Sequence, residues 1–266
     1  MNAASGSFAD LRLRILSALV LVTAGVGGVV AGGLVFLLLL TLVAGLMVWE
    51  LLRMLDGDAP VLKHATIAVI GGVAVFRIGF DSGPLAQAGL MLAPVIGLVV
   101  LPRDRGLFLV YCSAVLFAVA GLFGLRSGAG FAWTLWLILV VMAADMGGYF
   151  FGRIFGGAKI LPRISPKKTW SGTLGGWAMA ALIGLGFAAT TTAGVPMILL
   201  SVLAAIASQA GDVAESAIKR HAGVKDASNL IPGHGGFLDR FDALVAASLF
   251  MLAAGAWIGL PTGGTL

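Results

Sequence analysis

The 266-residue sequence is poor in charged residues and almost free of cysteine. Only 11% of its residues are charged and 59% are hydrophobic, whereas soluble domains carry about 25% charged residues. So few charges cannot cover the surface of a water-soluble domain of this length, which excludes that class. The single cysteine, Cys112, excludes an intramolecular disulfide and a cysteine metal cluster. It lies in an apolar run, and we expect it to be packed and inert.

Long apolar runs fill most of the chain. Several reach the roughly 20 residues that a membrane-spanning helix needs, and the short alternating segments of a transmembrane barrel are missing. The 39 glycines fit close helix packing in a bilayer. We therefore predict an all-α, polytopic integral membrane protein with about nine transmembrane helices. The expected spans are roughly residues 15–30, 34–52, 65–80, 85–101, 107–125, 131–151, 174–189, 195–210 and 243–260.

The basic residues fall on one side of this predicted topology. With a cytoplasmic N-terminus and nine alternating spans, all but Arg77 and Arg126 of the 17 Lys and Arg residues are cytoplasmic. Such an asymmetry is typical of multi-pass proteins, whose cytoplasmic loops carry the excess of positive charge. The net charge of +5 is therefore explained by loops at a membrane, and we expect no nucleic-acid partner.

We expect one membrane domain over residues 1–266. Its N-terminal spans cover about 15–125 and its catalytic part about 131–260. The catalytic part includes two cytoplasmic loops, 152–172 and 211–242, which are longer than a turn between helices requires. Long irregular loops of this kind tend to carry function.

Carboxylates are paired in the second loop. Asp212 and Glu215 are three residues apart, and so are Asp239 and Asp242. On a helix, residues at this spacing share a face, so each pair would direct two carboxylates to one point. If the two helix ends are neighbours, up to four carboxylates converge at the membrane surface.

Carboxylate oxygens suit a hard cation such as Mg²⁺, which is commonly bound by one or two carboxylates with waters and substrate phosphates. Zinc is disfavoured because the three histidines are scattered. The basic residues of the same loop suit an anionic substrate, and the combination predicts a phosphate-transfer site. The alternative is a set of salt bridges at lipid headgroups. It explains single basic residues but not the five acids of this loop, of which the fifth is Asp226. These basic residues are Lys219, Arg220, Lys225 and Arg240.

In the motif PGHGG at residues 232–236, the proline fixes its own φ, whereas the glycines permit backbone conformations that other residues avoid. Such a loop can bring backbone N–H groups close to a phosphate, which makes Gly235 and Gly236 candidates for substrate binding. His234 is a candidate to hydrogen-bond a phosphate or a leaving group. The alternative is a tight turn that returns the chain to the membrane, and the motif alone favours that reading.

The first loop contains SPKKTWSG, which places Ser165, Lys167 and Lys168 just before a predicted helix. Helix N-termini attract anions, although a lipid-headgroup patch explains these residues equally well, and the GxxxxGK[ST] pattern of a P-loop is missing. Asp145 lies inside the predicted span 131–151. A carboxylate in an apolar helix is costly and indicates function. A structural partner for the basic loops is the alternative for Asp145.

Residues 216–242, SAIKRHAGVKDASNLIPGHGGFLDRFD, resemble the signature of the phosphatidate cytidylyltransferase (CDP-diacylglycerol synthase) family. DMGGYFFGRIFGG and SPKKTWSG resemble upstream segments of the same family. The sequence departs from the family pattern at Gly148, where alanine is expected, and at Ser171, where many relatives carry glutamate. The second departure removes an acid that could have taken part in catalysis.

The resemblance implies an enzyme of phospholipid biosynthesis that makes CDP-diacylglycerol and pyrophosphate from CTP and phosphatidic acid. It implies a site at the cytoplasmic face of a bacterial inner membrane, in contact with membrane lipids. It also implies Mg²⁺, with a second cation left open, and a homodimer.

From the residues and the resemblance together we predict roles for individual side chains. The predicted metal ligands are Asp212, Asp239, Glu215 and Asp242. The predicted catalytic residues are Asp212, Asp239, Asp242, Lys225 and His234. The predicted substrate-binding residues are Lys167, Lys168, Lys219, Arg220, Arg240, Ser165, Gly235, Gly236 and Asp145.

Two other classes of membrane protein are possible on the sequence. A transporter for an anionic metabolite would suit the topology, but transporters usually place their sites near the bilayer midplane between paired, broken helices. A different membrane phosphotransferase, such as a polyprenol kinase or a CDP-alcohol transferase, is the second alternative. The DG…AR…G…D…D arrangement of the CDP-alcohol transferases is missing from this sequence.

Overall fold

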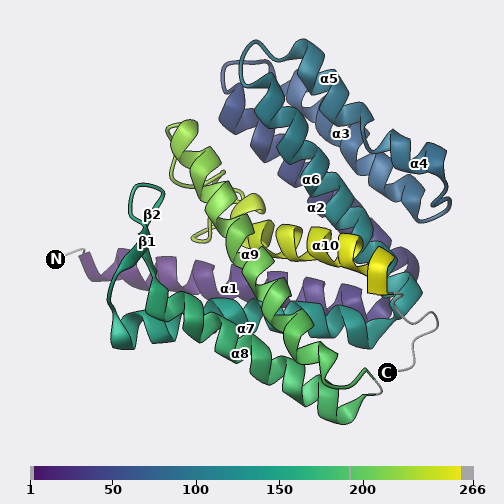
Figure 1. The fold of residues 1–266 in the computed structure, drawn as a ribbon. Coiled ribbons are helices and arrows are strands. Elements are labelled where there is room, and N and C mark those ends of the chain that lie inside the picture. The colour runs from purple at the N-terminus through teal and green to yellow at the C-terminus, as the bar shows by residue number, and fades with distance from the viewer. Residues whose placement is uncertain (1–2, 192, 259–266) are drawn as a thin grey trace. The chain divides into compact units, whose positions relative to one another are not determined.

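The structure is a computed structural model that describes residues 3–191 and 193–258, and this part of the chain is almost entirely helical (Figure 1). The described residues also contain one small two-stranded antiparallel sheet. In chain order the elements are α1 (Ala3–Ala31), α2 (Gly33–Leu55), α3 (Val61–Ile78), α4 (Pro84–Gly89), α5 (Leu92–Val100), α6 (Arg105–Gly124), the π-helical turn η1 (Leu125–Ala129), α7 (Phe131–Phe155), β1 (Lys159–Leu161), β2 (Ser165–Thr169), α8 (Trp170–Thr190), α9 (Pro196–His221) and α10 (Leu238–Ile258).

Within the described residues, seven helices are long and apolar enough to cross a membrane. This confirms the predicted all-α, polytopic fold class, although nine spans were expected. The segments with this property are Leu13–Ala31, Gly33–Leu55, Val61–Ile78, Arg105–Ala129, Phe131–Phe155, Trp170–Thr190 and Pro196–His221.

The expected span at residues 85–101 is divided into the short helices α4 and α5. Pro84 stands at the start of α4, and α5 has nine residues, which gives a length of about 14 Å. That is about half of the hydrocarbon thickness of a bilayer. The expected span at 243–260 coincides with α10, which is not among the seven candidate membrane-spanning helices. Residues 259 and 260 of the expected span lie outside the described part of the chain.

The loop expected at residues 152–172 is mostly regular. Helix α7 continues to Phe155, and β1 pairs with β2 in antiparallel register, with Lys159 opposite Thr169. Thr169 then caps α8, because its hydroxyl accepts a hydrogen bond from the backbone N of Gly172 at 3.2 Å. The expectation of an irregular loop was therefore wrong for this segment. In the other expected loop, α9 extends to His221 and makes the first part helical.

The chain divides into two compact units. The first comprises Met1–Leu116 and Ala222–Phe241, and the second comprises Phe117–His221 and Asp242–Leu266. The signature motif is thus shared between them, with the residues before Ala222 and from Asp242 onward in the second unit.

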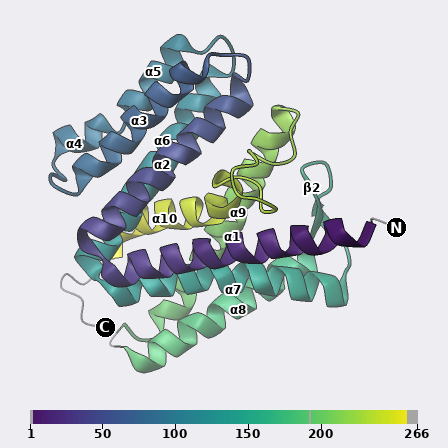
Figure 2. The ribbon, with the colours of Figure 1, turned by 180° about the vertical axis from the view of Figure 1, so that it is seen from behind.

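In the first unit, α2 packs against α3, and α3 packs against α5 (Figures 1 and 2). The face of α2 that carries Met47, Val48, Leu51 and Leu52 is fully buried. A Cβ atom on Gly72 of α3 would lie 3.1 Å from the backbone oxygen of Thr41, so glycine permits the close approach of these two helices.

In the second unit, α7 and α8 run side by side and α9 packs against both (Figure 1). A Cβ atom on Gly172 would lie 2.5 Å from the backbone oxygen of Gly148, and one on Gly176 would lie 2.7 Å from that of Ala144. Glycines on α8 therefore set the contact with α7. A Cβ atom on Gly148 itself would lie 3.8 Å from the backbone oxygen of Gly172, so this departure from the family pattern has no steric consequence.

Candidate functional site

The acids of α9 are each paired with a lysine. Asp212 and Glu215 both lie on the helix, which confirms the geometry assumed from their spacing. Lys219, one turn further on, places its Nζ 2.6 Å from Oε2 of Glu215, whose side chain is fully buried. Lys168 of β2 places its Nζ 2.5 Å from Oδ2 of Asp212. Each lysine thus forms an ion pair with one acid at the end of α9, and the fully buried Glu215 needs such a partner because burying an unpaired charge is costly.

Asp242 brings a further carboxylate into the same unit. It lies ahead of the apolar part of α10, and only 9% of its surface is exposed. The pKa of Asp242 is raised to about 7, mainly by burial and then by the negative charges of Asp212 and Asp145. The backbone N–H of Ala243 and the charge of Lys219 act in the opposite direction. Acids of α7, α9 and α10 therefore act on one region of the second unit.

Asp239, three residues before Asp242 on α10, is part of the first unit and holds its own loop. Its Oδ2 accepts hydrogen bonds from the backbone N of Ala227 at 2.8 Å and from that of Gly236 at 2.7 Å. A carboxylate that accepts backbone N–H groups ties two points of a loop together. The role of Asp239 as a metal ligand stays a prediction, and the structure adds a role in shaping the loop.

A second carboxylate holds this loop, and the sequence analysis missed it. Glu50 of α2 is fully buried. Its Oε1 accepts hydrogen bonds from Oγ of Ser228 at 2.6 Å and from the backbone N of Phe237 at 2.9 Å, and its Oε2 accepts one from the backbone N of Leu238 at 2.7 Å. The carboxylate thus lies at the N-terminus of α10, where the helix dipole favours negative charge.

Glu50 explains why residue 236 is a glycine. A Cβ atom on Gly236 would collide with the Glu50 carboxylate, so glycine at this position allows the loop to approach the acid. The signal that could have identified Glu50 is the one that identified Asp145, namely an acid inside an apolar span.

The PGHGG motif forms a turn against α1. Gly235 has a φ of 84°, in the region that favours glycine. Nδ1 of His234 lies 2.9 Å from Oγ of Ser17, which also donates to the backbone oxygen of Pro232 at 3.0 Å. Nε of Arg240 donates to the backbone oxygen of His234 at 2.8 Å. The motif thus forms a tight turn, as its alternative interpretation predicted. The substrate roles of His234 and Arg240 stay predictions.

The other predicted binding residues lie at the surface. Ser165 and Lys167 are on one face of β2 and Lys168 is on the other, since side chains alternate along a strand. Lys168 is the lysine that reaches Asp212, whereas Lys167 is exposed. Arg220 on α9 and Lys225 in the loop are also exposed. Their predicted roles remain open.

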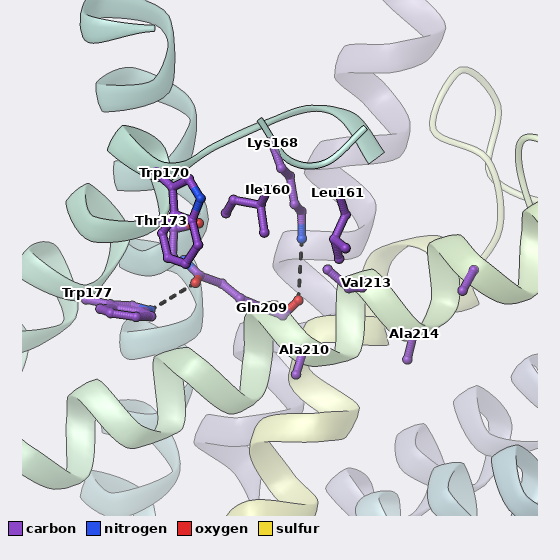
Figure 3. A pocket seen from close by; sticks show the side chains of 11 residues that line it. Ile160, Leu161, Lys168, Trp170, Thr173, Trp177, Gln209, Ala210, Val213 and Ala214 are labelled. Atoms are coloured by element: carbon purple, nitrogen blue, oxygen red, sulfur yellow. Dashed lines mark hydrogen bonds between the residues drawn. The ribbon is translucent and has the colours of Figure 1, made fainter. Parts of the chain in front are cut away.

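A cavity of about 440 Å³ lies beside Lys168, with walls from the hairpin, α8 and α9 (Figure 3). Its lining is almost wholly apolar. The residues that line it are Ile160, Leu161, Lys168, Trp170, Thr173, Trp177, Gln209, Ala210, Val213, Ala214 and Ala217.

Among the described residues, no group of three or more His, Cys, Asp or Glu side chains is close enough to bind a metal ion as it stands. The side chains nevertheless fit a divalent cation. Besides burial, repulsion from Asp212 and Asp145 raises the pKa of Asp242, and a bound cation would relieve that repulsion. The predicted ligands therefore remain candidates.

The fold is a mostly helical membrane protein in which carboxylates lie beside lysines near the end of α9. Such an arrangement is suited to bind phosphates next to a lipid phase. The sequence matches the model of the Cytidylyltransferase family over residues 12–257, and the chain belongs to this family. This confirms the family indicated by residues 216–242.

Some relatives match most of the chain and others match half of it. The chain is 34% identical to a phosphatidate cytidylyltransferase of Haemophilus influenzae, over 90% of this chain and 96% of that one. It is 36% identical to one of Pseudomonas aeruginosa, over 89% of this chain and 94% of that one. It is 48% identical to one of Brucella suis, but the match spans half of the length of either chain.

Proposed function

We propose that the protein transfers the cytidylyl group of CTP to phosphatidate. A phosphate oxygen of phosphatidate bonds to the α-phosphorus of CTP, the bond from that phosphorus to the oxygen leading to the β-phosphate breaks, and pyrophosphate leaves. The product is CDP-diacylglycerol. The observation that carries this proposal is the cluster of Asp212 and Asp242 with Lys168 and Lys219. The names of the relatives from H. influenzae and P. aeruginosa support it.

The side chains contribute charge and position. The attacking phosphate is already an anion, so the reaction does not need a strong general base. Lys168 and Lys219 would neutralise phosphate oxygens, and the fixed geometry of α9 would align the two substrates. Mg²⁺, when bound, supplies further neutralisation of the phosphates. Asp212 and Asp242 would hold it, with Glu215 and Asp239 as the other predicted ligands.

We further propose that the site faces the cytoplasm, at the inner membrane of a bacterium, and that the chain acts as a homodimer. The cytoplasmic site is supported by the one-sided distribution of Lys and Arg. It also suits the substrates, because CTP is water-soluble and phosphatidate resides in the membrane. The bacterial relatives support the inner-membrane location.

The test is a transfer assay with purified protein in detergent. CTP labelled at the α-phosphate is mixed with phosphatidate, with and without Mg²⁺, and the label in the lipid fraction is measured. We expect labelled lipid and unlabelled pyrophosphate when all components are present. Labelling that does not depend on phosphatidate, or no labelling at any Mg²⁺ concentration, would overturn the proposal.

A further inference from the structure

We propose that the cavity beside Lys168 binds the glycerol and the first acyl carbons of phosphatidate, with the lipid phosphate at Lys168. This inference rests on the proposed function and adds the place of its lipid substrate. The volume of about 440 Å³ lies in the range of about 300–1,000 Å³ that is usual for small-molecule sites. A cavity of this volume is large enough for only part of a lipid, so the rest of the acyl chains would continue into the bilayer.

The chemistry of the wall favours an amphiphilic anion. Trp170 and Trp177 of α8 and Ile160 and Leu161 of the hairpin give the cavity apolar sides. Figure 3 shows Lys168 extending from the hairpin between the two aliphatic side chains toward α9. One cation at the edge of an apolar cavity matches a phosphate attached to hydrocarbon.

The side-chain and backbone oxygen atoms of Gln209 already accept hydrogen bonds. Its Oε1 accepts a hydrogen bond from Nε1 of Trp177 at 3.0 Å, and its backbone oxygen accepts one from Nζ of Lys168 at 3.4 Å (Figure 3). A cytosine base would need donors and acceptors along its edge, because a buried polar group without partners is costly. The cavity therefore suits the lipid better than the base of CTP.

Helix α9 places the cavity next to the acids. Ala210, Val213, Ala214 and Ala217 recur at helical spacing and line the cavity. Asp212 lies between them in sequence and pairs with Lys168 from the neighbouring face. A lipid in the cavity would thus present its phosphate to the charged cluster while its hydrocarbon stays on the apolar face.

A thiol introduced by Ala214→Cys tests the occupant directly. Ala214 lines the cavity and is exposed, whereas the native Cys112 is fully buried, so a water-soluble maleimide will label the introduced thiol selectively. We expect phosphatidate, but not CTP or phosphatidylcholine with the same acyl chains, to slow labelling by at least about fivefold. Arg163→Cys, at the exposed turn of the hairpin and outside the cavity, is the matched control and should label at one rate throughout.

The results separate the lipid site from the proposed function. Protection by CTP alone, or no protection by phosphatidate in a protein that transfers cytidylyl groups, would overturn the lipid site and leave the function. Protection of the Ala214→Cys thiol by phosphatidate, together with a lack of transfer activity in the wild-type protein, would overturn the function instead.

A kinetic variant gives an independent measurement. Ala214→Phe adds bulk inside the cavity and should lower the affinity for its occupant at least about fivefold, which corresponds to about 1 kcal/mol. We expect the KM for phosphatidate to rise by that factor and the KM for CTP to stay within about twofold. Leu199→Phe, on an exposed position of α9 outside the cavity, controls for added bulk. A rise in the KM for CTP instead would overturn the inference.

Discussion

Oε2 of Glu50 accepts a hydrogen bond of 2.7 Å from the backbone N of Leu238, although 188 residues separate the two in sequence. The bond joins the C-terminal part of α2 to the start of α10. Together with the bonds from Phe237 and Ser228, it fixes the loop of the signature motif to α2. The loop is thereby held by an acid that no motif contains.

Loss of this anchor should reduce activity strongly. In Glu50→Ala the backbone N–H groups of Phe237 and Leu238 lose their acceptor, and hydrogen bonds to charged groups contribute about 1.5–3 kcal/mol each. We expect cytidylyl transfer to fall at least about tenfold and the melting temperature in detergent to fall. Glu50→Gln keeps one acceptor oxygen and should retain intermediate activity. Wild-type kinetics in Glu50→Ala would show that the anchor does not matter.

The space around Gly236 should be as critical as the acid. In Gly236→Ala the new methyl group meets the Glu50 carboxylate, so we expect the variant to lose most of its activity. The shorter acid of Glu50→Asp should restore part of it in the double variant, which a general defect in folding would not allow. Gly148→Ala is the control, because a methyl group there makes only ordinary contact. Equal losses in both single variants would contradict the steric explanation.

Protons should compete with the divalent cation at Asp242. Its pKa of about 7 means that the carboxylate is protonated below neutral pH in the absence of metal. We expect the apparent affinity for Mg²⁺, measured from activity, to increase with increasing pH. The increase should be up to about tenfold per pH unit below pH 7, and the affinity should level off above pH 7. Asp242→Asn should bind Mg²⁺ more weakly and lose this pH dependence.

The same pKa predicts how folding depends on pH without metal. The folded pKa of Asp242 is higher than its ordinary value of 3.8, so the folded state binds the proton more tightly. The stabilisation from this proton is fully present below the ordinary value and is lost as pH rises through 7. Thermal unfolding in EDTA should show this decline in the wild type and a smaller one in Asp242→Asn. Identical pH profiles would contradict it.

Local patterns in the sequence were enough to predict part of the candidate site. The spacing of Asp212 and Glu215 indicated that they would share a face if they lay on a helix, and both do lie on α9, which extends into the segment expected to be a loop. The role of Glu50 depends on partners far away in sequence, which no spacing encodes. The hairpin at 159–169 was missed because its strands have three and five residues, too few to show alternation. The division of residues 84–100 into α4 and α5 was hidden by uniform hydropathy.

Asp239→Asn distinguishes the two roles open to Asp239. Its Oδ2 accepts hydrogen bonds from Ala227 and Gly236, and the amide oxygen of asparagine can accept both. If the side chain only shapes the loop, the variant should therefore fold and work nearly normally. We predict instead that it folds in the membrane but abolishes CTP turnover, because a neutral amide binds a divalent cation and balances phosphate charge poorly. Near-normal turnover at saturating Mg²⁺, with an unchanged melting temperature, would assign Asp239 to the loop and leave metal binding to the acids of the second unit.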